Sequence, residues 1–302
     1  MSSKKHSKKS TKKYRTHSGR PESLIGVRPD KRLGQNFLVD EEIIEKIVSE
    51  CGATKDSLVI EIGPGTGALT LPLAERAGRV ICIELDEKMA QGLRVKTFAS
   101  GNVEIIEGDI LETDIKKIAA DALEEYGLKN YCIVGNLPYY ITTPILLKLL
   151  NDGLAAESIT VMMQKEVADR IAAEPGTRAS GAITYSVHYH AEVSEVAYVP
   201  RECFYPVPGV DSAVLRLDLR DGPPIKVKDQ DMLFRCIKAG FSMRRKTLLN
   251  ALTTLDGYTK EMLSDALSNA GIEATRRAES LTLEEFAVLS DSLQEAKACE
   301  KR

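Results

Sequence analysis

The feature that most constrains the fold is a strand, a glycine turn and a helix that follow one another early in the chain. Residues 57–62 form an apolar run, residues 63–67 read Gly-Pro-Gly-Thr-Gly, and a helical pattern spans 68–76. Gly63 and Gly65 would let the backbone approach a ligand closely, and the N-terminus of the helix offers free amide groups. This order predicts the first part of a nucleotide-binding βαβ unit.

The same alternation continues beyond this unit. Further strand patterns lie at 79–84, 102–107, 131–134 and 158–163, and a helical pattern over 164–173 follows the last of them. A chain that alternates strands and helices in this way forms a parallel sheet covered by helices. The sequence therefore predicts an α/β fold.

A polar residue lies at or near the carboxyl end of each of four successive strands. These residues are Glu61, Glu84, Asp109 and Asn136. In an open α/β sheet the carboxyl ends of the strands form the edge at which ligands bind. We therefore expect one ligand site, built from these side chains and the glycine turn.

The second and third strands indicate the kind of ligand. Glu84 follows Gly67 by 17 positions, where a carboxylate would accept hydrogen bonds from ribose hydroxyls. Asp109 can accept a hydrogen bond from an adenine amino group, with Ile110 beside the ring. The glycines are spaced G-x-G-x-G rather than G-x-G-x-x-G, which favours a cofactor that has an adenosine but no pyrophosphate.

The segment 136–140, Asn-Leu-Pro-Tyr-Tyr, follows the strand at 131–134. Pro138 prevents the strand from continuing, and Pro144 lies where a helix would begin. Two rings and one amide suit a planar polar substrate, because rings stack on its face while the amide binds its edge. A purely structural strand-to-helix turn fits this segment equally well, so the motif alone does not decide.

The C-terminal part of the chain changes character. Two prolines fix φ in the loop 204–208, Phe-Tyr-Pro-Val-Pro, so that it holds Phe204 rigidly. A strand pattern over 214–219 precedes a linker at 221–224, and only helical patterns follow over 229–302. The basic run 243–246, Met-Arg-Arg-Lys, either contacts RNA phosphates or belongs to a solvated helix face.

Composition excludes several classes of protein. The hydrophobic content of 43% and the charged content of 28% are ordinary for a globular protein. No apolar run approaches the roughly 20 residues of a membrane span, and the basic N-terminus lacks the apolar core of a secretory signal. The six cysteines are scattered without a C-x-x-C pair, which predicts a reduced, cytoplasmic protein without structural zinc.

One pair of histidines is a candidate metal site. His188 and His190 lie two residues apart in 185–193, a segment that fits either a helix or a strand. They have no acidic or Cys companion of the kind that metal sites need nearby in sequence. We therefore expect packing or solvent contact for both, and no metal.

The N-terminal residues carry an uneven share of the charge. Residues 1–20 hold eight of the 41 Lys and Arg residues and none of the 44 acidic residues. Such a segment, poor in apolar groups, is predicted to be a disordered basic tail over 1–22, which either attracts phosphates or only aids solubility. The predicted domains are this tail, a large domain over 23–220 and a helical domain over 221–302.

A series of motifs occurs in order along the chain. They are 34–38 (Gly-Gln-Asn-Phe-Leu), 61–67, Glu84, 108–109 (Gly-Asp), 136–139 (Asn-Leu-Pro-Tyr), Phe204-x-Pro206-x-Pro208 and 244–246 (Arg-Arg-Lys). In this combination, over about residues 25–300, the chain resembles the KsgA family of small-subunit ribosomal RNA adenine N6,N6-dimethyltransferases. The resemblance implies a seven-stranded Rossmann-like methyltransferase sheet with a small all-helical C-terminal domain.

The resemblance also implies S-adenosylmethionine as the methyl donor. The family pattern assigns its binding to Asn36, Leu38, Gly63, Glu84, Asp109 and Asn136, and the strand-end reasoning adds Gly65 and Ile110. The implied substrate is a pair of adjacent adenines in the loop of the last helix of small-subunit rRNA, within the immature small ribosomal subunit. Each adenine would receive two methyl groups, and we expect the enzyme to be a monomer.

The implied catalytic residues are Asn136, Leu137, Pro138, Tyr139 and Phe204. The Asn136 side-chain oxygen and the Leu137 carbonyl would accept hydrogen bonds from the target amine, while Tyr139 and Phe204 clamp the base. Such a site works mainly by positioning.

Three alternatives remain open. A macrolide-resistance methyltransferase of large-subunit rRNA shares the Asn-Leu/Ile-Pro-Tyr logic, but the segment 204–214 and the Arg-Arg-Lys run resemble the KsgA side more. A non-catalytic ribosome-assembly factor could use the same fold. A nicotinamide dehydrogenase is disfavoured, because the glycine spacing fits poorly and no histidine is placed for hydride transfer.

Overall fold

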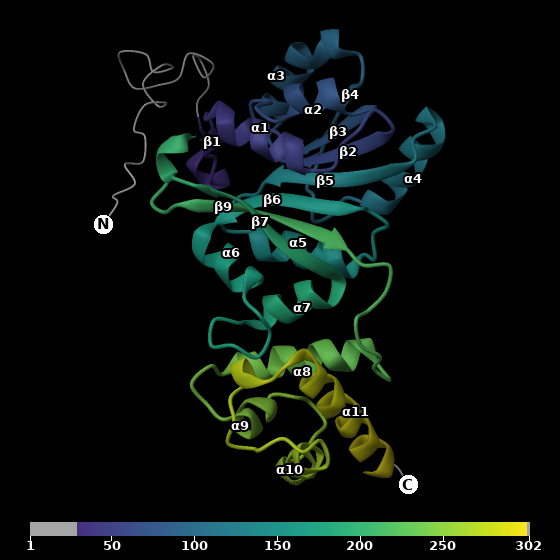
Figure 1. The fold of residues 1–302 in the computed structure, drawn as a ribbon, viewed down its shortest axis with the longest axis vertical. Helices are drawn as coiled ribbons and strands as arrows, with labels where there is room; N and C mark the ends of the chain where they lie inside the picture. Colours follow the sequence, from purple (N-terminus) through teal and green to yellow (C-terminus); the bar gives the residue numbers. More distant parts are fainter. Residues whose placement is uncertain (1–28, 301–302) are drawn as a thin grey trace, which may run out of the picture. The chain divides into compact units, whose positions relative to one another are not determined.

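A computed structural model describes residues 29–300, so the predicted tail over 1–22 lies outside the described residues. These residues divide into two compact units. The first comprises residues 29–168 with Ser194–Leu217, and the second comprises Asp169–Val193 with residues 218–300. The domain division after residue 220 stays a prediction. The two units differ from the predicted domains, because residues 169–193 belong with the C-terminal helices (Figure 1).

A seven-stranded sheet forms the centre of the first unit, in the order β4-β3-β2-β5-β6-β9-β7. The predicted seven-stranded sheet is therefore confirmed. Its strands are β2 (Ser57–Ile62), β3 (Arg79–Glu84), β4 (Val103–Glu107), β5 (Asn130–Asn136), β6 (Ser158–Gln164), β7 (Ala191–Val199) and β9 (Ser212–Leu219).

Strands β4, β3, β2, β5 and β6 pair in parallel, so their carboxyl ends share one edge of the sheet. Strand β5 extends beyond the expected 131–134 and includes Asn136, which pairs with Met162 of β6. Gly135 makes this possible, because a Cβ there would lie 2.9 Å from the Ile62 carbonyl oxygen. The glycine therefore serves close strand packing rather than ending the strand.

Helices connect the strands of this unit. They are α1 (Glu41–Glu50), α2 (Thr70–Arg76), α3 (Glu87–Thr97), α4 (Ile115–Tyr126) and α5 (Thr142–Asn151), and α6 (Lys165–Ala172) begins in this unit and ends in the second. Asp40 caps α1, since its side chain accepts a hydrogen bond from the amide of Ile43 at 3.1 Å. Helix α2 begins at Thr70 rather than at residue 68, because Gly67 still has a positive φ of 84°.

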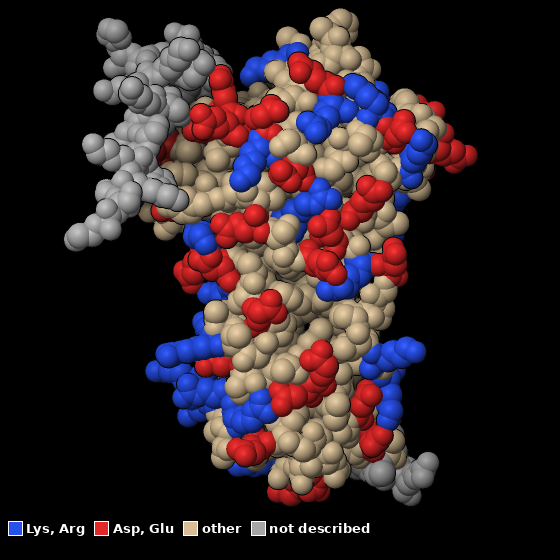
Figure 2. All heavy atoms as spheres, in the orientation of Figure 1, with Lys and Arg blue, Asp and Glu red and all other residues tan. Residues whose placement is uncertain are grey.

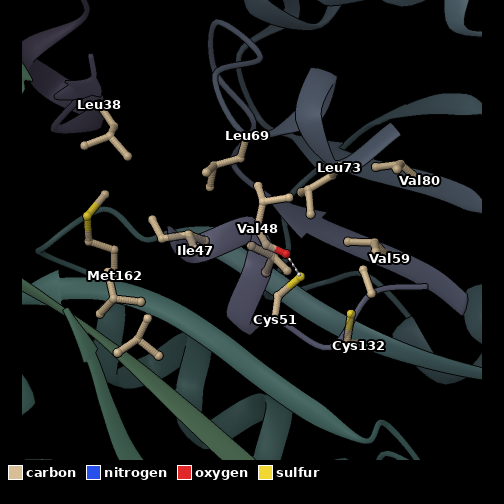
Figure 3. Packing of buried hydrophobic residues seen from close by; sticks show 14 of the residues in the cluster. Leu38, Ile47, Val48, Cys51, Val59, Leu69, Leu73, Val80, Cys132 and Met162 are labelled. Carbon is tan, nitrogen blue, oxygen red and sulfur yellow. Dashed lines mark hydrogen bonds between the residues drawn. The ribbon is translucent and has the colours of Figure 1, made fainter. Parts of the chain in front are cut away.

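One face of the sheet is covered by α1 and α2. Ile47 and Val48 of α1 meet Leu73 of α2 over Val59 and other sheet residues (Figure 3). Burial of such side chains contributes about 1.5–3 kcal/mol each, so this cluster stabilises the unit. In the same cluster the buried Cys51 thiol donates to the carbonyl of Val48 at 3.3 Å. The cysteines here act as small apolar residues.

A short second sheet joins two distant segments of the first unit. Strand β1 (Phe37–Leu38) pairs antiparallel with β8 (Phe204–Tyr205), with Leu38 opposite Phe204. The amide of Val39 continues this pairing by donating to the carbonyl of Cys203 at 2.9 Å. The segment 34–38 and the 204–208 loop are thus neighbours.

The second unit is helical, as predicted. Its main helices are α7 (Ala182–His190), α8 (Gln230–Ser242), α9 (Leu248–Leu252), α10 (Lys260–Asn269) and α11 (Leu283–Glu300). Tyr185, buried at its centre, packs edge-on against Phe286 with ring centroids 5.0 Å apart. Its hydroxyl donates to the carbonyl of Leu281 at 2.6 Å. This unit has its own apolar core.

The basic run 243–246 lies in the turn between α8 and α9 with exposed side chains. The run therefore lies in a turn rather than on a helix face, and its exposure fits both RNA contact and solvation. Figure 2 shows Lys and Arg side chains gathered at this edge of the unit, beside α8 and α9. Within residues 29–300, no helix combines the length and apolar character needed to cross a membrane.

Candidate active site

The glycine turn between β2 and α2 has the backbone that the sequence requires. Gly63 and Gly65 have φ values of 65° and 54°, which side-chain-bearing residues rarely adopt. The Gly65 amide donates to Glu84 Oε2 at 2.9 Å, and a Cβ on Gly65 would lie 3.2 Å from the Phe37 ring. The turn is therefore fixed against both the second strand end and the 34–38 segment.

Glu84 ends β3 and is almost fully buried. Its second carboxylate oxygen, Oε1, accepts a hydrogen bond from the Asp86 amide at 2.9 Å. Burial is the main cause that raises its pKa, and the hydrogen bonds from Asp86 and Gly65 oppose that rise. Because a carboxylate has about four acceptor positions, these two amides leave capacity for ligand hydroxyls.

Glu61 lies one residue before the end of β2 and is 1% exposed. The hydroxyl of Thr70 donates to its Oε2 at 2.6 Å, and the thiol of Cys82 donates at 3.4 Å. Burial raises the pKa of Glu61 to about 7. This carboxyl therefore changes its charge near neutral pH.

Asn136 meets the 34–38 segment from the other side of the glycine turn. Its Nδ2 donates to the carbonyl of Asn36 at 3.0 Å. The following Leu137 amide donates to the carbonyl of Met162 at 3.1 Å, which fixes the strand end against β6. The Pro138 carbonyl then accepts from the Thr142 hydroxyl at 3.0 Å, where α5 begins.

Tyr139 is held at its far end. Its hydroxyl shares a 2.6 Å hydrogen bond with the hydroxyl of Ser212, a fully buried residue at the start of β9. Burial raises the pKa of Tyr139. The bond restricts the ring, which lines a cavity at this edge of the sheet.

This cavity encloses about 750 Å³, including its open mouth. It brings together nine residues expected at the site, which are Asn36, Leu38, Gly63, Gly65, Glu84, Asn136, Leu137, Pro138 and Tyr139. Glu61, expected at this edge, lines it too. Gln35 and Thr66 also line it, although the sequence analysis gave them no role; both lie inside the motifs 34–38 and 61–67. A single sequence offers no signal for the contact between Tyr139 and Ser212.

Three expected residues do not line this cavity. The Asp109 carboxylate accepts a hydrogen bond from the Leu111 amide at 2.8 Å in the turn after β4, and Ile110 is buried beside it. Phe204 is 1% exposed and belongs to the apolar cluster that contains Leu38 and Val199. The roles expected for these three residues stay predictions.

Each ring of the histidine pair makes a hydrogen bond to a backbone carbonyl. His188 Nε2 lies 3.2 Å from the carbonyl of Ile171, and His190 Nδ1 lies 2.7 Å from the carbonyl of Ser186. Burial lowers the pKa of both rings. Across residues 29–300, no group of three or more His, Cys, Asp or Glu side chains is arranged to hold a metal ion.

Solved structures of similar proteins share this architecture. A dimethyladenosine transferase from Plasmodium falciparum is 25% identical, with a TM-score of 0.70 over 86% of this chain and 98% of that one. The 23S rRNA methyltransferase ErmE is 27% identical, with a TM-score of 0.64 over 85% of this chain and 99% of that one. The fold and its strand-end cavity thus define a Rossmann-like methyltransferase.

Sequence comparisons define the family. The family model described as ribosomal RNA adenine dimethylase matches residues 27–295. A ribosomal RNA small subunit methyltransferase A from Oceanobacillus iheyensis is 43% identical over 93% of this chain and 97% of that protein. Its namesake from Geobacillus thermodenitrificans is 47% identical over 87% and 90%. The chain belongs to the ribosomal RNA adenine dimethylase family, which confirms the resemblance and the predicted enzyme class.

Proposed function

We propose that this enzyme transfers methyl groups from S-adenosylmethionine to the N6 amines of two adjacent adenines in the 3′-terminal helix loop of small-subunit rRNA. The observation that carries this proposal is the shared cavity. Asn136 and Tyr139, which suit an adenine, line the same space as Glu84 and the glycine turn, which suit an adenosine-bearing donor. The relatives named small subunit methyltransferase A support the choice of ribosomal subunit.

The residues of the cavity fit the cofactor. Gly63 and Gly65 leave room where side chains would obstruct, and Glu84 would accept from the ribose hydroxyls. Asn36 and Leu38 would close the opposite wall. When bound, S-adenosylmethionine supplies an electrophilic methyl group on a positively charged sulfur.

The chain's own contribution is to orient the amine. The lone pair of an exocyclic adenine amine is delocalised into the ring, so the amine is a poor nucleophile. The Asn136 Oδ1 and the Leu137 carbonyl would accept its two N–H groups and turn its lone pair toward the methyl group. Positioning of this kind can lower a barrier by several kcal/mol.

The Tyr139 ring would stack on the base, and its face would favour the positive charge that develops on nitrogen. The hydrogen bond to Ser212 keeps the ring in place before the base arrives. We keep Phe204 as the second wall of the clamp, which requires its buried side chain to turn outward when the base enters. Asp109 and Ile110 would bind the adenine of the cofactor once it extends beyond the present cavity.

The family assigns rRNA as the substrate. The enzyme would act on the immature small ribosomal subunit. It would do so as a monomer, in the cytoplasm. The exposed basic run 243–246 supports contact with RNA phosphates.

Transfer of a labelled methyl group to purified ribosomal subunits tests this function. The enzyme would be incubated with tritiated cofactor and with small or large subunits that lack adenine dimethylation. We expect label in the small-subunit rRNA alone. Label confined to the large-subunit rRNA would instead favour the resistance-type activity, and absence of label from both would contradict the proposal.

A further inference from the structure

The N-terminal strap, defined here as residues 30–38, forms one wall of the cavity. Its end is fixed by the pairing of β1 with β8. Two side-chain hydrogen bonds fix its middle, one from Gln35 and one from Asn136. These two bonds join the strap to opposite sides of the cavity, the cofactor side and the base side.

Gln35 uses both ends of its amide. Its Oε1 accepts a hydrogen bond from the Asp30 amide at 2.8 Å, and its Nε2 donates to Asp86 Oδ2 at 3.0 Å. Asp86 is itself fixed, because its other oxygen caps α3 by accepting from Lys88 at 2.9 Å. The Asp86 amide also donates to Glu84. Gln35 therefore ties the strap to the rigid turn that follows Glu84.

The bond between the strap and Asn136 sets the orientation of the catalytic amide. A backbone carbonyl can only accept, so the Asn36 carbonyl requires Nδ2 of Asn136 to face the strap. Oδ1 then faces away from the strap. If the carbonyl withdrew, the amide could turn over and present its N–H groups to an amine that also donates.

We propose that Gln35 is a positioning residue that holds the strap on Asp86, so that the Asn36 carbonyl keeps Asn136 Oδ1 aimed at the target amine. This inference rests on the proposed function of Asn136. It makes the methyl-transfer step depend on a residue that touches neither reacting atom. A misplacement of this kind can slow an enzyme by up to about a hundredfold.

Reversal of the hydrogen bond between residues 35 and 86 tests the role. In Gln35→Glu two carboxylates face each other and the bond is lost. Adding Asp86→Asn restores a donor on the other side, and asparagine still caps a helix well. We expect Gln35→Glu to lower kcat about tenfold or more at saturating cofactor and RNA, and the double variant to return to within about threefold of wild type.

The controls separate positioning from folding. Gln91→Ala removes an exposed glutamine that bonds Glu87 on α3, and we expect wild-type kcat. Thermal unfolding of Gln35→Glu should remain cooperative. Wild-type kcat in Gln35→Glu, or a double variant as slow as the single one, would overturn the proposal. If calorimetry detects no binding of S-adenosylmethionine to the wild-type enzyme, the proposed function is overturned, and the positioning role with it.

Discussion

Two aromatic side chains, expected to be the two walls of one clamp, lie in very different surroundings. Tyr139 lines the cavity and is held by one hydroxyl contact to Ser212. Phe204 is buried in the apolar cluster, opposite Leu38 in the pairing of β1 with β8. The Tyr139 ring thus lines the cavity already, whereas Phe204 supports the fold in this state and reaches the proposed clamp only after its side chain turns outward.

The same contrast extends to the polar groups at the cavity. Burial raises the pKa of both Glu61 and Glu84, so holding these carboxylates charged costs folding free energy. The apolar cluster around Phe204 contributes folding free energy. Substitutions at the cavity should therefore lower activity with little loss of stability, whereas substitution of Phe204 should lower stability strongly.

Phe204→Ala should have the largest effect, and it should fall on stability. Truncation of a buried phenylalanine costs about 3–5 kcal/mol of unfolding free energy, which denaturant unfolding measures. Phe98→Ala is the matched control, because that ring is 88% exposed and should change stability by less than about 0.5 kcal/mol. Equal stability of the two variants would show that Phe204 does not support the core.

Asn136→Ala should lower activity and leave stability nearly unchanged. Loss of one fixed hydrogen-bonding group from an active site lowers kcat by about a hundredfold to a thousandfold, measured as methyl transfer at saturating cofactor. Unfolding free energy should change far less than in Phe204→Ala. Asn151→Ala, an exposed substitution at the end of α5, should behave as wild type. Normal turnover by Asn136→Ala would refute the mechanism.

Glu61→Gln should sharpen the contrast through its dependence on pH. The folded state raises the pKa of Glu61 from 4.5 to about 7, so it binds the proton more tightly than the unfolded chain does. Wild-type stability is therefore lost as pH rises between these values, by roughly 3 kcal/mol. Glutamine cannot ionise. In denaturant unfolding, the stability of Glu61→Gln relative to wild type should increase from pH 4.5 to pH 8. A difference that stays constant with pH would contradict the raised pKa of Glu61 in the folded state.

Tyr139→Ala should have the smallest of these effects. Loss of one stacked ring costs about 1–3 kcal/mol of base binding, which should appear as a raised KM for RNA with cofactor affinity unchanged. Tyr126→Ala on the exposed end of α4 serves as its control. An unchanged KM would remove Tyr139 from the base site.

Much of this arrangement could be predicted from the sequence, because it depends on local signals. The strands 57–62 and 79–84 and the glycine turn all follow from residue order. The burial of Phe204 could not, since it arises from pairing with Leu38 across 165 intervening residues. The bond from Gln35 to Asp86 is likewise a tertiary contact without a local pattern.

Mass spectrometry of digested small-subunit rRNA tests the central claim most directly. Undermethylated small subunits would be treated with the wild-type enzyme and isotopically labelled cofactor. The account predicts N6,N6-dimethyladenosine at two adjacent positions in the 3′-terminal helix loop, and none with Asn136→Ala. Label at other nucleotides, or equal dimethylation by the variant, would contradict it.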